Sequence, residues 1–239
     1  MPMARFPGKF VELHADLSAD AGRALAAEAD DFVAAVSEYL GVQPAAPRVY
    51  VFRNGWNLWL YLRRQCTPFS ERTGACFEAT DGRLTVAVAA DEGGRPAQSS
   101  LRHELTHAVI AANFAPFVPP MPWVDEGLAQ VFESGCPPGQ DPDRAARLAT
   151  LAPTFERRLV RLAGIAEHDQ LTEDDYLVAW GFTRFLLHDK AYGIRAIRTC
   201  LEPPAPGEGI LSRFVRCLGA PPRQLAGPFA KRVRSLGAR

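Results

Sequence analysis

The feature that most constrains the fold is a change of hydrophobic periodicity along the chain. In the first ninety or so residues, short alternating segments take turns with helical ones. From about residue 97 onward, apolar residues recur at helical spacing almost without interruption. This change predicts an α+β protein in which a mixed α/β lobe is followed by an all-helical C-terminal lobe.

Turn and cap residues set the expected boundaries of the first lobe. Ser18 and Gly41 are typical residues for the two ends of a helix, and Asp81-Gly82 is a strong hairpin signal. The expected elements are strands over 9–15 and 48–53, helices over 18–40 and 56–65, and a hairpin of 75–80 with 83–89. The aromatic cluster Trp56, Trp59 and Tyr61 is expected to belong to the core.

Proline-rich joints separate the helices expected after residue 97. These helices cover 97–114, 124–134, 142–163, 173–190, 191–201, 208–218 and 222–236. The joint at 136–142 divides the chain best, into lobes 1–135 and 136–239, although neither looks independent.

Charge and hydropathy exclude several classes of partner. The 239 residues contain 27 Lys+Arg and 27 Asp+Glu, and a zero net charge argues against binding nucleic acid. No apolar run approaches the roughly 18 residues of a membrane span. The N-terminus has no apolar segment of signal-peptide length, so the protein is expected to be cytoplasmic if this start is native and exported if a leader was removed.

The cysteines form no C-x-x-C pair, and the five of them leave one over after any pairing. In so large a chain we expect most of them to be reduced packing residues. Cys66 and Cys76 could form a bridge if the protein were exported.

The segment that carries chemistry is His103-Glu104-Leu105-Thr106-His107, within the predicted helix 97–114. The two histidines are one turn apart and share a face that differs from the apolar face, so both imidazoles can point at one ion. Glu104 is rotated by about 100° around the helix from His103. A carboxylate placed there can take a proton from water that a metal activates.

A third metal ligand is expected downstream, because a catalytic zinc takes three protein ligands and keeps one position open. Glu126 follows His107 after eighteen intervening residues, in the segment Trp123-Val-Asp-Glu-Gly-Leu-Ala that opens another helix. The alternative for Glu126 is a charge favoured by the helix dipole. Asp125 is a rival ligand, or a residue that orients an imidazole by a hydrogen bond.

The H-E-x-x-H motif followed by Glu126 in a W-x-x-E-G-x-A setting resembles the gluzincin zinc metallopeptidases of the peptidase MA superfamily. The flanks are similar to small peptidase MA-like domains, although only 99–134 is distinctive. The resemblance implies Zn²⁺ held by His103, His107 and Glu126, with Glu104 as general base and a peptide or protein as substrate.

The resemblance also implies a zincin-like fold. In it, the edge strand of a small twisted sheet runs beside the active-site helix, and we expect that strand at Arg83–Ala89. The helical lobe would close the cleft, so that 1–135 and 136–239 form one catalytic unit.

Tyr176 is the candidate for stabilising the oxyanion, because a phenol donates a hydrogen bond without carrying charge. Gluzincins frequently place a Tyr or His there, and His168 and His188 are the alternatives. The structural alternative for Tyr176 is packing against Trp180 one turn on. For His188 it is a protonated imidazole favoured at a helix end.

The expectation is therefore a zinc metallopeptidase of unspecified substrate and oligomeric state. Two alternatives stay open. One is a zinc-binding but inactive peptidase-like protein with a binding or regulatory role. The other is a helical scaffold for partner binding in which the motif arose by chance.

Overall fold

A computed structural model of the protein describes residues 3–65, 74–79, 81–90, 97–114 and 120–236. The chain divides into two compact units: Met1–Asn113 with Phe132–Pro138, and Phe114–Val131 with Gly139–Arg239. A mixed sheet in the first unit and the many helices confirm the predicted α+β class. None of the helices in the described part combines the length and apolar character that a membrane crossing requires.

The first unit is built on a five-stranded sheet with the order β1-β2-β3-β5-β4. The strands are β1 (Ala4–Pro7), β2 (Glu12–Ala15), β3 (Arg48–Phe52), β4 (Gly74–Glu78) and β5 (Leu84–Ala89). The central strands β2, β3 and β5 are parallel, whereas β1 and β4 pair antiparallel at the two edges. The prediction of an edge strand at Arg83–Ala89 is wrong, because β5 pairs with a strand on each side and β4 is the edge.

The N-terminal strand β1 is a second difference from the sequence analysis, which predicted one strand over 9–15. The chain turns between β1 and β2, and the carboxylate of Asp30 accepts a hydrogen bond of 2.8 Å from the backbone N–H of both Phe10 and Val11. Asp30 therefore satisfies backbone donors of a turn that an apolar pattern alone does not reveal.

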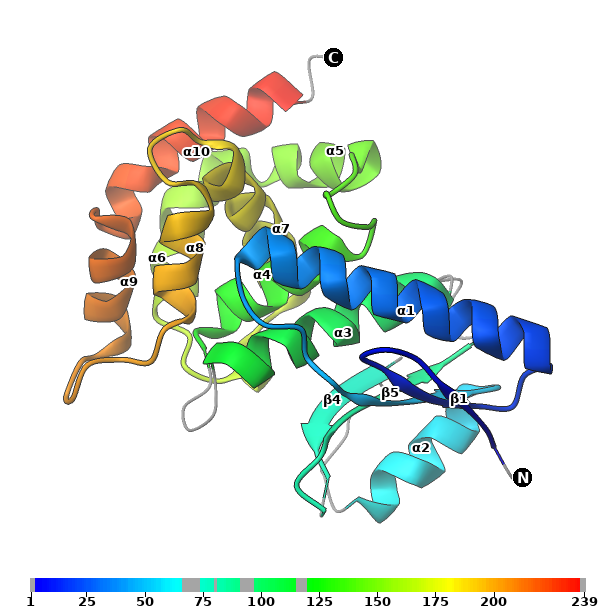
Figure 1. The fold of residues 1–239 in the computed structure, drawn as a ribbon. Coiled ribbons are helices and arrows are strands. Elements are labelled where there is room, and N and C mark those ends of the chain that lie inside the picture. The colour runs from blue at the N-terminus through cyan, green and yellow to red at the C-terminus, as the bar shows by residue number, and fades with distance from the viewer. Residues whose placement is uncertain (1–2, 66–73, 80, 91–96, 115–119, 237–239) are drawn as a thin grey trace. The chain divides into compact units, whose positions relative to one another are not determined.

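Helices cover both faces of this sheet. They are α1 (Ala19–Leu40), α2 (Gly55–Arg64) and α3 (Ala97–Phe114), and Figure 1 shows α1 and α3 on one face and α2 on the other. Ser18 caps α1 by accepting from the N–H of Ala21, and Gly41 ends the helix with a φ of 64°. The core expectation for Trp56 is wrong, because this side chain is 64% exposed at the start of α2.

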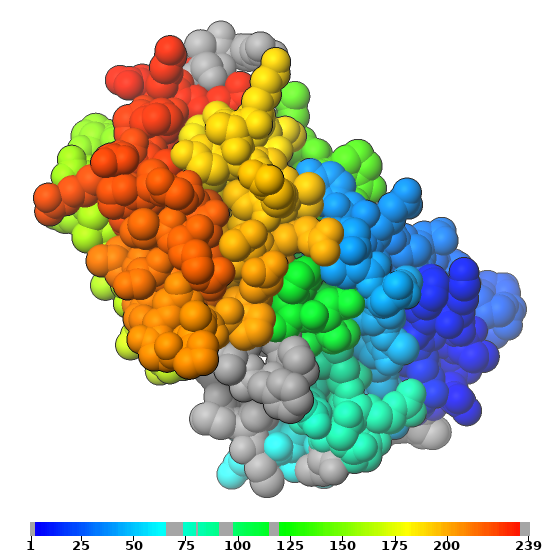
Figure 2. All heavy atoms as spheres, turned by 60° about the vertical axis from the view of Figure 1, so that its left-hand side comes forward, coloured from blue at the N-terminus to red at the C-terminus, as the bar shows by residue number. Residues whose placement is uncertain are grey.

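The remaining helices are α4 (Pro122–Phe132), α5 (Pro142–Thr150), α6 (Phe155–Ala163), α7 (Glu173–His188), α8 (Gly193–Leu201), α9 (Ile210–Leu218) and α10 (Pro222–Leu236). Figure 2 shows α8 and α9 in orange next to α10 in red on one face of the second unit. The single helix predicted over 142–163 is wrong. Pro153 has no N–H and its ring clashes with the preceding turn, so a 3-10 turn at Ala152–Thr154 separates α5 from α6.

The core of the second unit is an aromatic cluster. Trp123 of α4 lies 5.4 Å from Phe182 and 5.6 Å from Phe214, between ring centroids. Phe229 of α10 lies 4.4 Å from Phe155 and 5.4 Å from Phe182. These rings are fully buried and join helices that are distant in sequence.

Candidate metal centre

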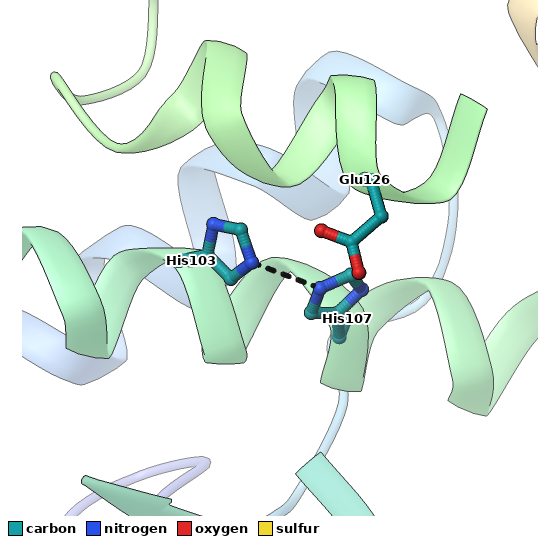
Figure 3. A group of neighbouring side chains, drawn as sticks. All are labelled: His103, His107 and Glu126. Carbon is teal, nitrogen blue, oxygen red and sulfur yellow. Dashed lines mark hydrogen bonds between the residues drawn. The ribbon is translucent and has the colours of Figure 1, made fainter. Parts of the chain in front are cut away.

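The helix α3 presents the two motif histidines on one side, as their spacing predicts. Its apolar residues, such as Leu105 at 0% exposure, are buried, whereas His103 and His107 are half-buried. The Nε2 atoms of the two rings face each other at 3.1 Å (Figure 3). Two nitrogens bound to one tetrahedral zinc at about 2.0–2.1 Å would lie about 3.3–3.4 Å apart, so this spacing suits a shared ion.

Glu126 completes a group of three possible ligands. One ligand atom from each of His103, His107 and Glu126 lies within 4.8 Å of the others, and Figure 3 shows the carboxylate beside the imidazole of His107. Glu126 is 5% exposed, and a buried carboxylate needs a cation or hydrogen-bond donors to offset its lost hydration. The three residues could therefore hold a metal ion, and their donor set does not by itself name the metal.

The carboxylate of Glu133 contacts the ring of His103, and no sequence motif pointed to it. Its Oε1 lies 2.9 Å from Nδ1 of His103. An ionised carboxylate only accepts hydrogen bonds, so Nδ1 carries the proton and a neutral His103 presents the lone pair of Nε2 to the group. The one signal in the sequence is a second carboxylate two helical turns after Glu126.

Close packing of α4 on α7 holds the segment that carries Glu126. Trp123 is 0% exposed in the aromatic cluster and anchors the start of α4. A Cβ at Gly127 would lie 2.2 Å from Oγ1 of Thr183 and 2.7 Å from the backbone oxygen of Ala179. These contacts explain the residues on either side of Asp125 and Glu126. Trp123 anchors the start of α4, and Gly127 lets α4 and α7 approach each other.

Glu104 is half-buried and lies against the edge strand. A Cβ at Gly74, the first residue of β4, would lie 2.8 Å from Cγ and 2.9 Å from Oε1 of Glu104. The carboxylate therefore lies against the edge strand β4, whereas the strand expected beside this helix was Arg83–Ala89. Glu104 is not a member of the three-residue group.

Asp125 is committed to another partner. Its Oδ2 lies 3.0 Å from Nε2 of His168, and Asp125 is 9% exposed. It is absent from the possible metal ligands found among the described residues. The pairing gives His168 a structural role, in addition to the oxyanion stabilisation for which it is an alternative to Tyr176.

Tyr176 and His188 both lie on α7, at opposite ends. The half-buried Tyr176 is in the first turn, and its backbone oxygen accepts a hydrogen bond of 3.2 Å from the side chain of Gln130, one turn beyond Glu126 on α4. For His188, burial and the charges of Arg184 and Arg232 lower the pKa. The protonated His188 expected at this helix end is therefore disfavoured, and the catalytic role of Tyr176 stays a prediction.

A comparison of the sequence with known protein families finds no match, and neither does a comparison with curated proteins.

Proposed function

We propose that the protein is a zinc-dependent metallohydrolase that cleaves peptide bonds. The observation that carries this proposal is the convergence of His103, His107 and Glu126 on one point, with their ligand atoms within 4.8 Å. Two imidazole nitrogens and one carboxylate are a common ligand set of catalytic zinc and leave a fourth position for water. The likeness of this segment to gluzincin metallopeptidases supports the same metal.

A zinc ion bound by these residues would supply a Lewis acid, which would make water nucleophilic at neutral pH and polarise a carbonyl. In our proposal, Glu104 accepts the proton of the attacking water and delivers it to the leaving amine. Its position next to His103 on α3 supports this role. Tyr176 is proposed to donate a hydrogen bond to the oxygen that becomes negative, with His168 as the alternative donor.

The edge strand β4 supports a peptide as the substrate. β4 is the edge strand of the described sheet and pairs with β5, and an edge strand is where an extended peptide adds through backbone hydrogen bonds. Because the carboxylate of Glu104 lies against Gly74 of β4, a peptide that adds to this edge would pass close to the proposed base.

The substitution Glu104→Gln tests the function, because the amide keeps the shape of the side chain and cannot accept the proton. We expect zinc content to stay at the wild-type value while hydrolysis of a fluorogenic peptide mixture falls by about 10²–10⁴-fold. Glu156→Gln, an exposed change on α6, serves as the matched control and should leave both unchanged.

An E104Q variant that remains as active as the wild type would refute the assignment of the base. Wild-type protein that binds zinc stoichiometrically and hydrolyses nothing under any metal condition would instead support the inactive, peptidase-like alternative. Purified protein with far less than one zinc per chain, not restored by added zinc, would refute the metal site itself.

A further inference from the structure

Two cysteines that are distant from the motif in sequence meet in the second unit. Cys200 lies in the last turn of α8 and Cys217 in the last turn of α9, and these two helices pack together. Both are free thiols. Sγ of Cys217 also lies 3.3 Å from the backbone oxygen of Thr199, the residue before Cys200. No sequence pattern marks this pair, because sixteen residues separate the two cysteines.

The surroundings of the pair distinguish its two members. The neighbouring thiol of Cys200 lowers the pKa of Cys217, and the charges of Arg216 and Arg213 act in the same direction, against burial and Glu208. Burial raises the pKa of Cys200. Cys217 is 8% exposed and Cys200 is 0% exposed, so Cys217 is both the better thiolate and the thiol nearer to solvent.

A buried arginine fixes the positive charge beside the thiols. Arg213 of α9 is 5% exposed, and its Nη2 donates to the backbone oxygen of Cys200 at 3.2 Å and to that of Glu202. Its Nε is buried and has no hydrogen-bond partner among the residues that the structure describes. This guanidinium ties α9 to the end of α8 and stays next to the sulfur atoms, where it favours a thiolate over a thiol.

We propose that Cys200 and Cys217 are a reversible disulfide modification site, with Cys217 as the attacking and Cys200 as the resolving thiol. The oxidant is a low-molecular-weight disulfide such as oxidised glutathione. The Cys217 thiolate attacks one sulfur of this oxidant, forms a mixed disulfide and releases one glutathione thiolate. Cys200 then loses its proton to solvent and attacks the Cys217 sulfur, which releases the second glutathione thiolate.

The electrons of this exchange balance. The two protein thiols lose two electrons and two protons overall, and one oxidised glutathione is reduced to two glutathione thiols. The product joins the ends of α8 and α9 covalently. It uses no residue of the metal group, so the proposal is independent of the proposed hydrolysis.

Peptide mapping of the folded wild-type protein tests the site. The protein is incubated with oxidised glutathione, its remaining thiols are alkylated, and it is digested with trypsin without reduction. Before alkylation, we expect a monomer whose intact mass has fallen by about 2 Da. After digestion, we expect residues 199–213 to be linked to residues 217–223. Dithiothreitol should restore both thiols. Recovery of both peptides in alkylated form, or linkage of either to another cysteine, would overturn the proposal.

Single variants separate the two roles. Cys200→Ser should stop at a stable glutathione adduct on Cys217, and Cys217→Ser should form neither the adduct nor the disulfide. Cys136→Ser is the matched control, because burial and Glu38 raise the pKa of Cys136 to about 11 and make it a poor nucleophile. Rapid glutathione uptake by Cys200 in C217S would reverse the assignment. The wild-type map decides the site even if a variant fails to fold.

Discussion

The Nε2 atoms of His103 and His107 lie 3.1 Å apart, a distance at which two lone pairs repel unless a proton or a metal ion lies between them. Glu133 engages Nδ1 of His103 and leaves the lone pair of Nε2 of the neutral ring to face His107, where it can accept a proton from His107 or bind a metal ion. The group is thus arranged for a cation before one binds, and much of the cost of orienting the imidazole is met in advance.

Removing the Glu133 carboxylate should therefore weaken metal binding. We expect Glu133→Ala to lower zinc affinity by about 10–100-fold, measured by competition with a chromophoric chelator. Glu133→Gln should recover part of the loss, because its amide oxygen still accepts a hydrogen bond. Glu156→Ala is the control, and unchanged affinity in E133A would contradict the role of Glu133.

At the scale of residues, the sequence predicted the features that the geometry of a single helix determines. The spacing of His103 and His107 fixes their shared face, and the residue types and the downstream segment pointed to Glu126. The contact of Glu133 with His103 and the pairing of Asp125 with His168 were not predicted. Each joins two segments whose contact no spacing along the chain encodes.

At the scale of elements, α4 and α7 approach closely at Gly127. Gly127→Ala would place a Cβ 2.2 Å from Oγ1 of Thr183 and 2.7 Å from the backbone oxygen of Ala179, which cannot move without moving α7. We expect the substitution to lower the free energy of unfolding by about 1–3 kcal/mol, measured by urea denaturation.

Gly227→Ala is the matched control for this change. Gly227 lies inside α10, and a Cβ there would meet no atom within 4 Å. The gain in helix propensity is opposed by the restriction on a residue that precedes Pro228, so we expect the free energy of unfolding to change by less than about 1 kcal/mol. An equal loss of stability in both variants would contradict the α4–α7 contact as its cause.

Element boundaries were predictable where caps or a long periodicity mark them. The helix 97–114 and the helix 222–236 begin and end in the structure where the pattern predicts, and Ser18 with Gly41 delimits α1. The edge position was predicted for the wrong strand of the hairpin, although β5 is apolar and buried along almost its whole length, as a strand paired on both sides is, and β4 ends in the exposed Glu78. Pro153 marks the break between α5 and α6 in the sequence. The apolar residues recur at helical spacing on both sides of it, and this favoured the prediction of a single helix.

At the scale of the whole molecule, a bound ion adds to stability, because it binds the folded chain and not the unfolded one. At a metal concentration one hundred times the Kd, this adds about 2.7 kcal/mol. For a chain of this length we expect a chelator to lower the Tm by about 5–10 °C, measured by differential scanning calorimetry.

The His107→Ala variant is the control for that shift. Without one imidazole the group loses a ligand, so the Tm of the variant should not respond to the chelator. A chelator effect of the same size in H107A would place the responsible ion elsewhere in the protein.

The burial of the tryptophans gives the molecule two optical classes of fluorophore. Trp56, which is 64% exposed, and its stacked neighbour Trp59 belong to the first unit, whereas Trp123 and Trp180, at 0% and 2%, belong to the second. A water-soluble quencher such as iodide should therefore quench the fluorescence of Trp56 and Trp59 and leave that of Trp123 and Trp180 unquenched. Because Trp123 begins the helix that carries Glu126, the unquenched emission reports on the surroundings of that helix without any added label.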